Sequence, residues 1–149
     1  MNDAKTELGR RILAIKQQRK LTWAGIAAEL GYSSTWTCAA CLGQMSMTWE
    51  TAEKAARLFG LDAAETELLQ AIPYRGSLPG AVPTDPLIYR FYELVMVYGT
   101  TWKELIQEEF GDGIMSAIDF DMSLERQPDQ KGDRVKVAMS GKFLPYKRY

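Results

Sequence analysis

Two charged residues lie within an otherwise apolar segment of this sequence, residues 87–98. They are Arg90 and Glu93, and their spacing of three places both on one face of a helix. Charges removed from water carry a large desolvation cost unless they are paired, so one interpretation is a structural ion pair. The other is an anion site, in which the planar fork of Arg90 grips an oxyanion and Glu93 orients Arg90 or transfers a proton.

Ser116 is a third polar residue with possible chemistry, because it comes just before an alternating segment. Apolar and polar residues alternate there, which predicts a half-buried strand, with Ile118, Phe120, Met122 and Leu124 on one side. Ser116 has the same parity as this apolar set, so its hydroxyl is expected on the buried side, where it needs a partner. Either this hydroxyl forms a hydrogen bond within the protein core, or it donates one to a bound anion.

The composition excludes several other chemistries. The chain of 149 residues has no histidine, so neither Ser-His-Asp nor Cys-His catalysis nor a His-ligated metal is available. Its two cysteines, Cys38 and Cys41, are too few for an all-cysteine zinc site. Their spacing is that of a redox pair, but the strand that precedes such a pair is missing, which favours core cysteines. We therefore expect no metal.

The elements that must position Arg90, Glu93 and Ser116 lie in the second half of the chain. Thr84 or Asp85 can cap a helix with Pro86 in its first turn, and Gly99 is expected to end it before a further helix over residues 100–110. The first of these helices is apolar on all sides, which predicts burial on all sides and a subunit interface. A second strand near residues 135–139 completes a hairpin. Because two strands alone are marginal, the hairpin must cover a helix or pair with a second subunit.

The first half predicts helices throughout residues 6–71, including the short helix, turn and short helix of a helix-turn-helix. Residues 72–86 hold four of the six prolines and form a connector. The expected architecture is α+β, with a helical domain over residues 1–75 and a small helix and β-hairpin dimerisation domain over residues 76–149.

A DNA-binding regulator with a C-terminal dimerisation hairpin is the alternative function. Its recognition helix would cover residues 35–42, but no lysine or arginine occurs between Lys20 and Lys54 to neutralise phosphates. The net charge of -1 also gives the chain no polybasic character, so we expect no nucleic-acid partner. No segment approaches a membrane span or a secretory signal, and a cytoplasmic, reducing setting is expected.

Long strings of the second half resemble the cyanase (cyanate hydratase, or cyanate lyase) family. The strings that carry the resemblance are residues 83–86, 89–93, 97–101, 110–118 and 141–145, with weaker similarity at residues 42–44 and 72–76. The similarity extends over nearly the whole chain, and the first half departs most at residues 36–41.

The resemblance implies that Arg90, Glu93 and Ser116 are the catalytic residues. It implies a reaction of cyanate with bicarbonate that gives carbamate and CO2, the carbamate then giving ammonia and a second CO2. No metal or organic cofactor is implied, since bicarbonate is a co-substrate. The implied assembly is a homodecamer of five dimers with sites between subunits, and the implied helix-turn-helix does not bind DNA. A scaffold of this family that has lost its activity is a further alternative.

Overall fold

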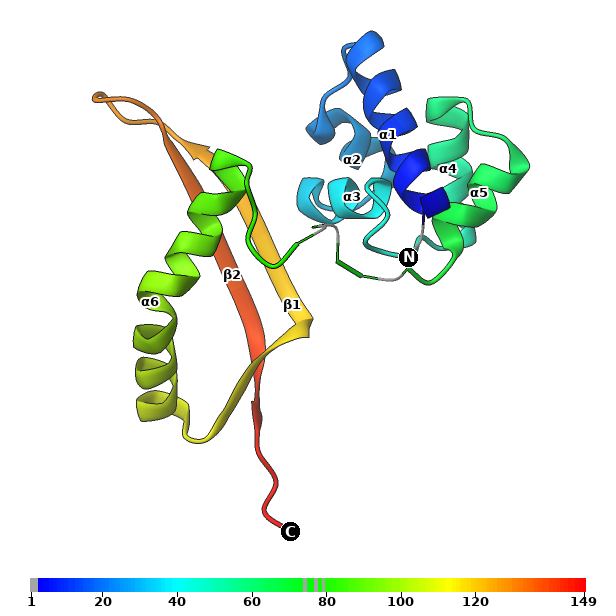
Figure 1. The fold of residues 1–149 in the computed structure, drawn as a ribbon. Helices are drawn as coiled ribbons and strands as arrows, with labels where there is room; N and C mark the ends of the chain where they lie inside the picture. The colour runs from blue at the N-terminus through cyan, green and yellow to red at the C-terminus, as the bar shows by residue number, and fades with distance from the viewer. Residues whose placement is uncertain (1–2, 74, 77, 79) are drawn as a thin grey trace. The chain divides into compact units, whose positions relative to one another are not determined.

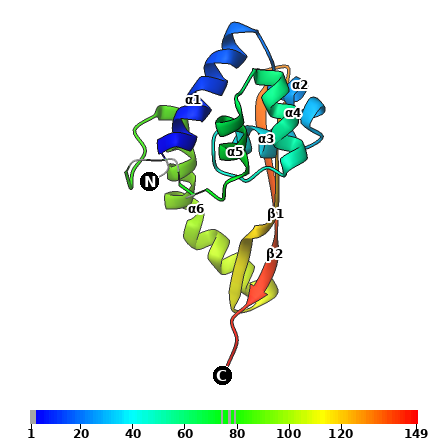
Figure 2. The same ribbon diagram turned by 90° about the vertical axis from the view of Figure 1, so that its right-hand side faces the viewer.

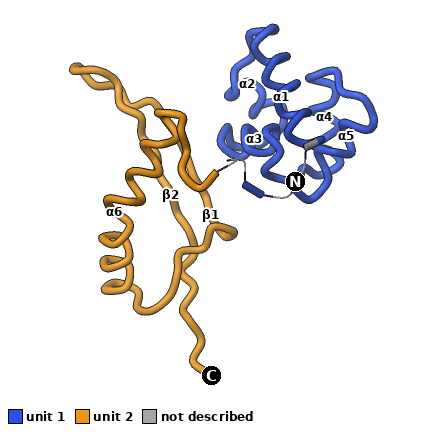
Figure 3. Tube along the Cα trace, viewed as in Figure 1, with its two compact units in different colours: residues 1–77 blue, residues 78–149 orange. Residues whose placement is uncertain are grey.

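The computed structural model describes residues 3–73, 75–76, 78 and 80–149. It divides into two compact units, residues 1–77 and residues 78–149, each described by itself (Figure 3). Unit 1 contains α1 (Asp3–Gln18), α2 (Trp23–Leu30), α3 (Ser34–Cys41), α4 (Trp49–Phe59) and α5 (Ala63–Gln70) (Figure 1). Unit 2 contains α6 (Pro86–Phe110) and the strands β1 (Gly113–Gln127) and β2 (Arg134–Pro145).

The helices of unit 1 begin at side chains that cap them. Thr22, Ser33, Thr48 and Asp62 each accept a hydrogen bond from the backbone N–H three residues further on, which satisfies a donor that the helix leaves unpaired. Gly31 ends α2 in the left-handed conformation, and Gly60 ends α4 in the same way. The prediction of helices throughout residues 6–71, with a short helix, a turn and a short helix among them, is therefore confirmed.

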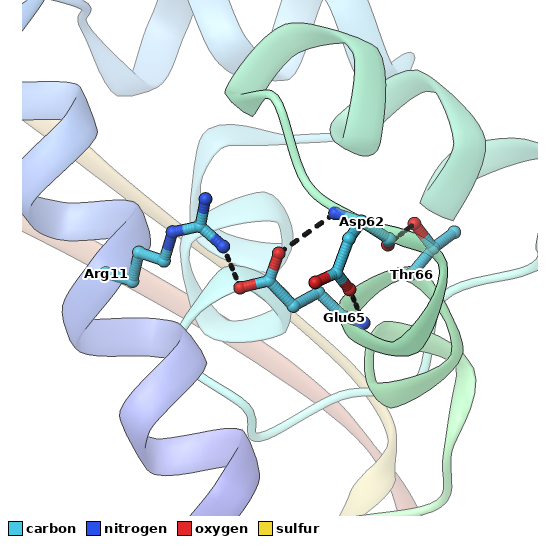
Figure 4. Close-up of polar contacts among 4 residues, drawn as sticks. All are labelled: Arg11, Asp62, Glu65 and Thr66. Carbon is cyan, nitrogen blue, oxygen red and sulfur yellow. Dashed lines mark hydrogen bonds and ion pairs between the residues drawn. The ribbon is translucent and has the colours of Figure 1, made fainter.

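The last helix of unit 1 is tied back to the first one. Asp62 and Glu65 form a reciprocal capping box at the start of α5, and Thr66 Oγ1 donates to the Asp62 carbonyl at 2.7 Å (Figure 4). Glu65 also accepts from Arg11 of α1, and this hydrogen bond raises the pKa of the Arg11 guanidinium. At the other end of α1, the buried Lys5 Nζ donates to the Ala71 carbonyl, just after α5.

Unit 1 closes around a hydrophobic core that all five helices share. Its fully buried members include Ile12 of α1, Ile26 and Leu30 of α2, Cys41 of α3 and Ala52 of α4, and Leu69 of α5 is nearly so. Burial raises the pKa of the Cys41 thiol to about 12, so this cysteine is unreactive at neutral pH. The prediction of core cysteines is confirmed for Cys41, whereas Cys38 is half-buried.

Unit 2 is built on one uninterrupted helix of 25 residues, α6. Asp85 Oδ1 accepts from the N–H groups of Leu87 and Ile88 at 2.9 Å each, and Pro86 is in the first turn, as predicted. The prediction that the helix ends at Gly99 is wrong. A glycine inside a helix costs only about 1 kcal/mol relative to alanine, and the stacked rings of Tyr98 and Trp102 flank it on the continuing helix.

The two strands form a longer hairpin than the alternation predicts. β1 and β2 pair antiparallel, and residues 113–115 pair with residues 143–145, a segment that the alternation left outside the strand. The strands run side by side along their length in both views (Figures 1 and 2). At the tip, Arg126 and Asp133 form an ion pair at 2.8 Å across the turn.

Neither the helix nor the hairpin of unit 2 is covered within one chain. α6 has no buried residue and makes few contacts with the hairpin, among them the stacked rings of Phe110 and Phe143. Among the described residues of unit 2, only Pro83 and Ser116 are buried. The described residues of unit 2 leave α6 uncovered, so the predicted burial is not achieved within this unit, and the subunit interface stays a prediction. No helix of the described residues is long and apolar enough to cross a membrane.

Candidate active site

Ser116 lies in an irregular segment of β1 where the ladder is interrupted. Met115 pairs with Phe143 and Phe120 pairs with Gly141, so residues 116–119 stand opposite the single residue Lys142. Such a bulge bends the strand and re-aims its side chains. The predicted alternation does not continue through it, and Ile118 is 98% exposed instead of buried.

The Ser116 side chain holds this bulge together. Its Oγ accepts hydrogen bonds from the N–H groups of Ile118 and Asp119, at 3.0 Å each, and the residue is only 5% exposed. The predicted burial of Ser116 is confirmed, although the cause is the bulge and not the strand parity. Within the described part of the chain, Ser116 Oγ takes part only as an acceptor. Its hydroxyl proton is therefore left to donate to another group.

Arg90 and Glu93 lie one turn apart near the start of α6. Arg90 Nη1 and Glu93 Oε2 are 3.9 Å apart, which is an ion pair without a direct hydrogen bond. Their side chains are 66% and 48% exposed. The expectation of a buried pair is thus wrong for the isolated chain, for the same reason as for α6 as a whole. The donors of the Arg90 fork are not engaged by the carboxylate.

An aromatic side chain lies beside the guanidinium. The ring of Tyr89 has its centroid 5.9 Å from Arg90 Cζ, within the range of a cation–π contact. Tyr92 packs near Tyr89, with ring centroids 6.2 Å apart. The sequence analysis did not assign these tyrosines a role, although they immediately flank the two charges in the sequence.

The structure brings Arg90 and Glu93 together but does not join them to Ser116 within one chain. In the described residues, Ser116 has no hydrogen bond to either of them. The twenty residues from Arg90 to Phe110 span about 30 Å of helix, and Ser116 follows that far end of α6 by only six residues. No group of three or more potential metal ligands occurs in the described part of the chain.

Comparison with known proteins assigns both halves of the chain to one family. Residues 5–73 match the family described as "Cyanate hydratase, N-terminal", and residues 80–148 match the "Cyanate lyase C-terminal domain". The chain belongs to the cyanate lyase family. The resemblance read from the sequence strings is therefore confirmed.

Individual cyanate lyase relatives match over nearly the full length. The chain is 60% identical over 146 residues to the cyanate hydratase of Methylibium petroleiphilum, covering 98% of this chain and 99% of the relative. It is 59% identical over 139 residues to the cyanate hydratase of Polynucleobacter asymbioticus, covering 93% and 95%. The crystal structure of cyanase from T. urticae matches with a TM-score of 0.81 at 35% identity, covering 93% of this chain and 96% of that one. The predicted α+β fold class is confirmed by this match.

The helix-turn-helix of unit 1 lacks the residues that contact DNA in DNA-binding proteins. The second helix of that pattern, α3, contains neither lysine nor arginine. Trp36 of α3 stacks on Tyr32, with ring centroids 4.2 Å apart, so part of the helix surface is occupied by an aromatic contact within unit 1. Such a helix lacks the cations that contact phosphates in DNA-binding proteins.

Proposed function

We propose that this member of the cyanate lyase family decomposes cyanate in a bicarbonate-dependent reaction. The products are carbamate and CO2, and the carbamate then gives ammonia and a second CO2. The observation that carries the proposal is the 60% identity, over 98% of the chain, to a protein named cyanate hydratase. The chemistry of Arg90, Glu93 and Ser116 supports it.

The main physical difficulty of this reaction is that both reactants are anions, which repel each other when brought together. The Arg90 fork supplies positive charge and several directed donors, which offset the repulsion and fix the orientation of the oxyanions. Ser116 adds a neutral hydroxyl donor. Its oxygen accepts hydrogen bonds from two backbone N–H groups, and its proton remains available to a bound anion. Holding two reactants at attack distance supplies much of the rate enhancement.

The reaction consumes a proton, and the proposed role of Glu93 is to supply it. An oxygen of bicarbonate attacks the carbon of cyanate, and loss of CO2 from the adduct leaves carbamate. Cyanate, bicarbonate and one proton balance carbamate and CO2, so each turnover takes up a proton. Glu93 lies beside Arg90 and transfers this proton while it holds the guanidinium in place. Because bicarbonate is the nucleophile, no protein nucleophile, metal or organic cofactor takes part.

The proposed site forms between subunits of a homodecamer of five dimers. Two features of unit 2 support this assembly: the uncovered apolar faces of α6, and the length of helix that separates Arg90 from the start of β1. A second copy packed on α6 would cover these faces and bring a Ser116 toward an Arg90. Fully burying one large apolar side chain stabilises by about 1.5–3 kcal/mol, so a few such residues suffice to drive association. The partners are thus cyanate, bicarbonate and further copies of this chain in the cytoplasm, without nucleic acid or membrane.

The experiment that tests the proposal measures ammonia release from cyanate with and without added bicarbonate. We expect release that depends on bicarbonate, and two CO2 formed per cyanate consumed. With labelled carbon in bicarbonate only, half of the CO2 carries the label. Ammonia release at the same rate in bicarbonate-depleted buffer would overturn the bicarbonate step, and no release in either buffer would overturn the activity.

A further inference from the structure

Gly141 of β2 lies against the backbone of the Ser116 bulge. A Cβ atom built on Gly141 would be 2.4 Å from the Ser116 carbonyl oxygen and 2.6 Å from Met115 Cγ. Neither distance is compatible with normal packing. The backbone of Gly141 is outside the left-handed region, so the conformation itself accepts other residues. The space beside Ser116, and not the backbone angle, requires glycine at this position.

The crowded atom is part of the backbone, so it does not move aside as a flexible side chain would. Gly141 pairs with Phe120, the first residue of β1 after the bulge, and this pair fixes the two strands on that side. A methyl group at residue 141 would therefore push the Ser116 peptide outward. The Ser116 Oγ is held by N–H groups two and three residues further along the same bulge, so its position would change as well.

We propose that Gly141 is a positioning residue, whose missing side chain sets the place of the Ser116 hydroxyl relative to bound anion. This inference rests on the proposed function, in which Ser116 donates to an anion. Displacing a reacting group by about 1 Å costs on the order of 100-fold in rate. Gly141 is thus expected to matter for turnover through Ser116 and not through contact with substrate.

The test compares Gly141→Ala with Gly113→Ala, a matched control in the same hairpin. A Cβ at Gly113 would be 2.4 Å from the Leu144 carbonyl oxygen and 2.5 Å from Phe143 Cζ, which is the same degree of crowding without contact with Ser116. We expect Gly141→Ala to lower kcat by about 100-fold, and Gly113→Ala to keep most of kcat at a similar loss of thermal stability. Equal losses of kcat in the two variants, or a wild-type kcat in Gly141→Ala, would overturn the proposal.

A double-mutant cycle separates this inference from the proposed function. If Gly141 acts through the hydroxyl, Ser116→Ala and Ser116→Ala/Gly141→Ala have the same kcat, because the group to be positioned is already gone. Losses that multiply in the double variant would mean that Gly141 acts independently of Ser116, and the inference fails. A wild-type kcat in Ser116→Ala would instead overturn the proposed role of Ser116 itself.

A measurement on wild-type protein keeps the proposal testable if Gly141→Ala does not fold. The amide protons of Ile118 and Asp119 donate to Ser116 Oγ, so their hydrogen exchange reports on how firmly the bulge is held. We expect both amides to exchange more slowly in the wild type than in Ser116→Ala. Equal exchange in the two proteins would show that the hydroxyl is not held in place, and would overturn the inference.

Discussion

The two units of this chain treat their apolar residues in opposite ways. Unit 1 buries apolar residues of all five of its helices, such as Ile12, Leu30 and Phe59, in one core. Unit 2 has a longer helix and a longer hairpin, yet α6 has no buried residue and the hairpin has one, Ser116. The proposed catalytic residues all belong to the unit without a core.

The difference shows that apolar residues in a sequence do not by themselves predict burial within the chain. In unit 1, apolar residues alternate with polar ones at helical spacing, and the chain itself supplies the second layer. In unit 2, apolar residues surround α6, so no single neighbouring element covers them. The following four predictions test this contrast, beginning with the largest expected effect.

Two leucines of similar exposure, one on α6 and one on α1, allow the exposed apolar surfaces of the two units to be compared. Leu94 on α6 is 43% exposed in the chain and Leu13 on α1 is 41% exposed. If Leu94 faces a second copy, Leu94→Asp places an unpaired charge in an interface, which costs about 4 kcal/mol, or on the order of 1,000-fold in association. We expect sedimentation to show dissociated subunits and ammonia release to be lost. Leu13→Asp should keep both, and the contrast fails if the two variants sediment alike.

Shortening a core side chain of unit 1 should lower its free energy of unfolding by the same amount at every protein concentration. Ile12 has no exposed surface, so Ile12→Ala removes apolar contacts and leaves a cavity, at about 2–5 kcal/mol. Urea unfolding followed by tryptophan fluorescence measures this loss, which should be independent of protein concentration. Unfolding of α6 should instead depend on protein concentration. A loss for Ile12→Ala that disappears at high concentration would contradict the independence of unit 1.

One Arg–Glu pair of unit 1, Arg11–Glu65, can be compared with the pair Arg90–Glu93 of unit 2, and the two should differ in function. Arg90→Lys keeps the charge near Glu93 but removes the planar fork, so we expect kcat to fall on the order of 100-fold, as when a directed donor is lost. Arg11→Lys in unit 1 should leave kcat unchanged and hardly change stability, because an ion pair of a solvent-exposed side chain contributes little. Turnover at the wild-type rate by Arg90→Lys would contradict the proposal that the guanidinium of Arg90 binds the anionic substrates.

The smallest effect comes from the pKa of Cys41. Burial raises this pKa to about 12, whereas the thiol of the unfolded chain ionises near pH 9, its ordinary value. Between these values the unfolded state loses a proton that the folded state keeps, so stability falls as pH rises, by at most about 1.4 kcal/mol per pH unit. Urea titrations from pH 8.5 to about 10 should show a shallower decline in Cys41→Ala. The same decline in both proteins would mean that water reaches this core.

Most of the fold follows from local sequence signals. The start of α6, with its cap at Asp85 and Pro86 in the first turn, was predicted because the cap satisfies backbone groups within a few residues. Gly99 does not end the helix, because such an end needs a left-handed glycine and Gly99 keeps the helical conformation within α6. Local signals do not show which of two acceptable conformations a glycine takes.

The candidate site was readable in its residues but not in its geometry. Arg90 and Glu93 are noticeable because they interrupt an apolar segment, and Ser116 because it precedes an alternating one. The bulge at residues 116–119 was missed, since it depends on the space left by Gly141 more than twenty residues away. A glycine inside a strand pattern was the one available signal. The exposure of Arg90 was missed because the apolar residues around it predict a buried helix, whereas the described residues of unit 2 leave α6 uncovered.

The bond from Lys5 to the Ala71 carbonyl closes unit 1 before the proline-rich connector begins. During translation, the residues whose contacts close unit 1 are therefore synthesised, and leave the ribosome, ahead of α6. Unit 1 can therefore fold on the nascent chain before the apolar segment of α6 emerges. That order limits the time in which the segment is exposed on an otherwise unfolded polypeptide.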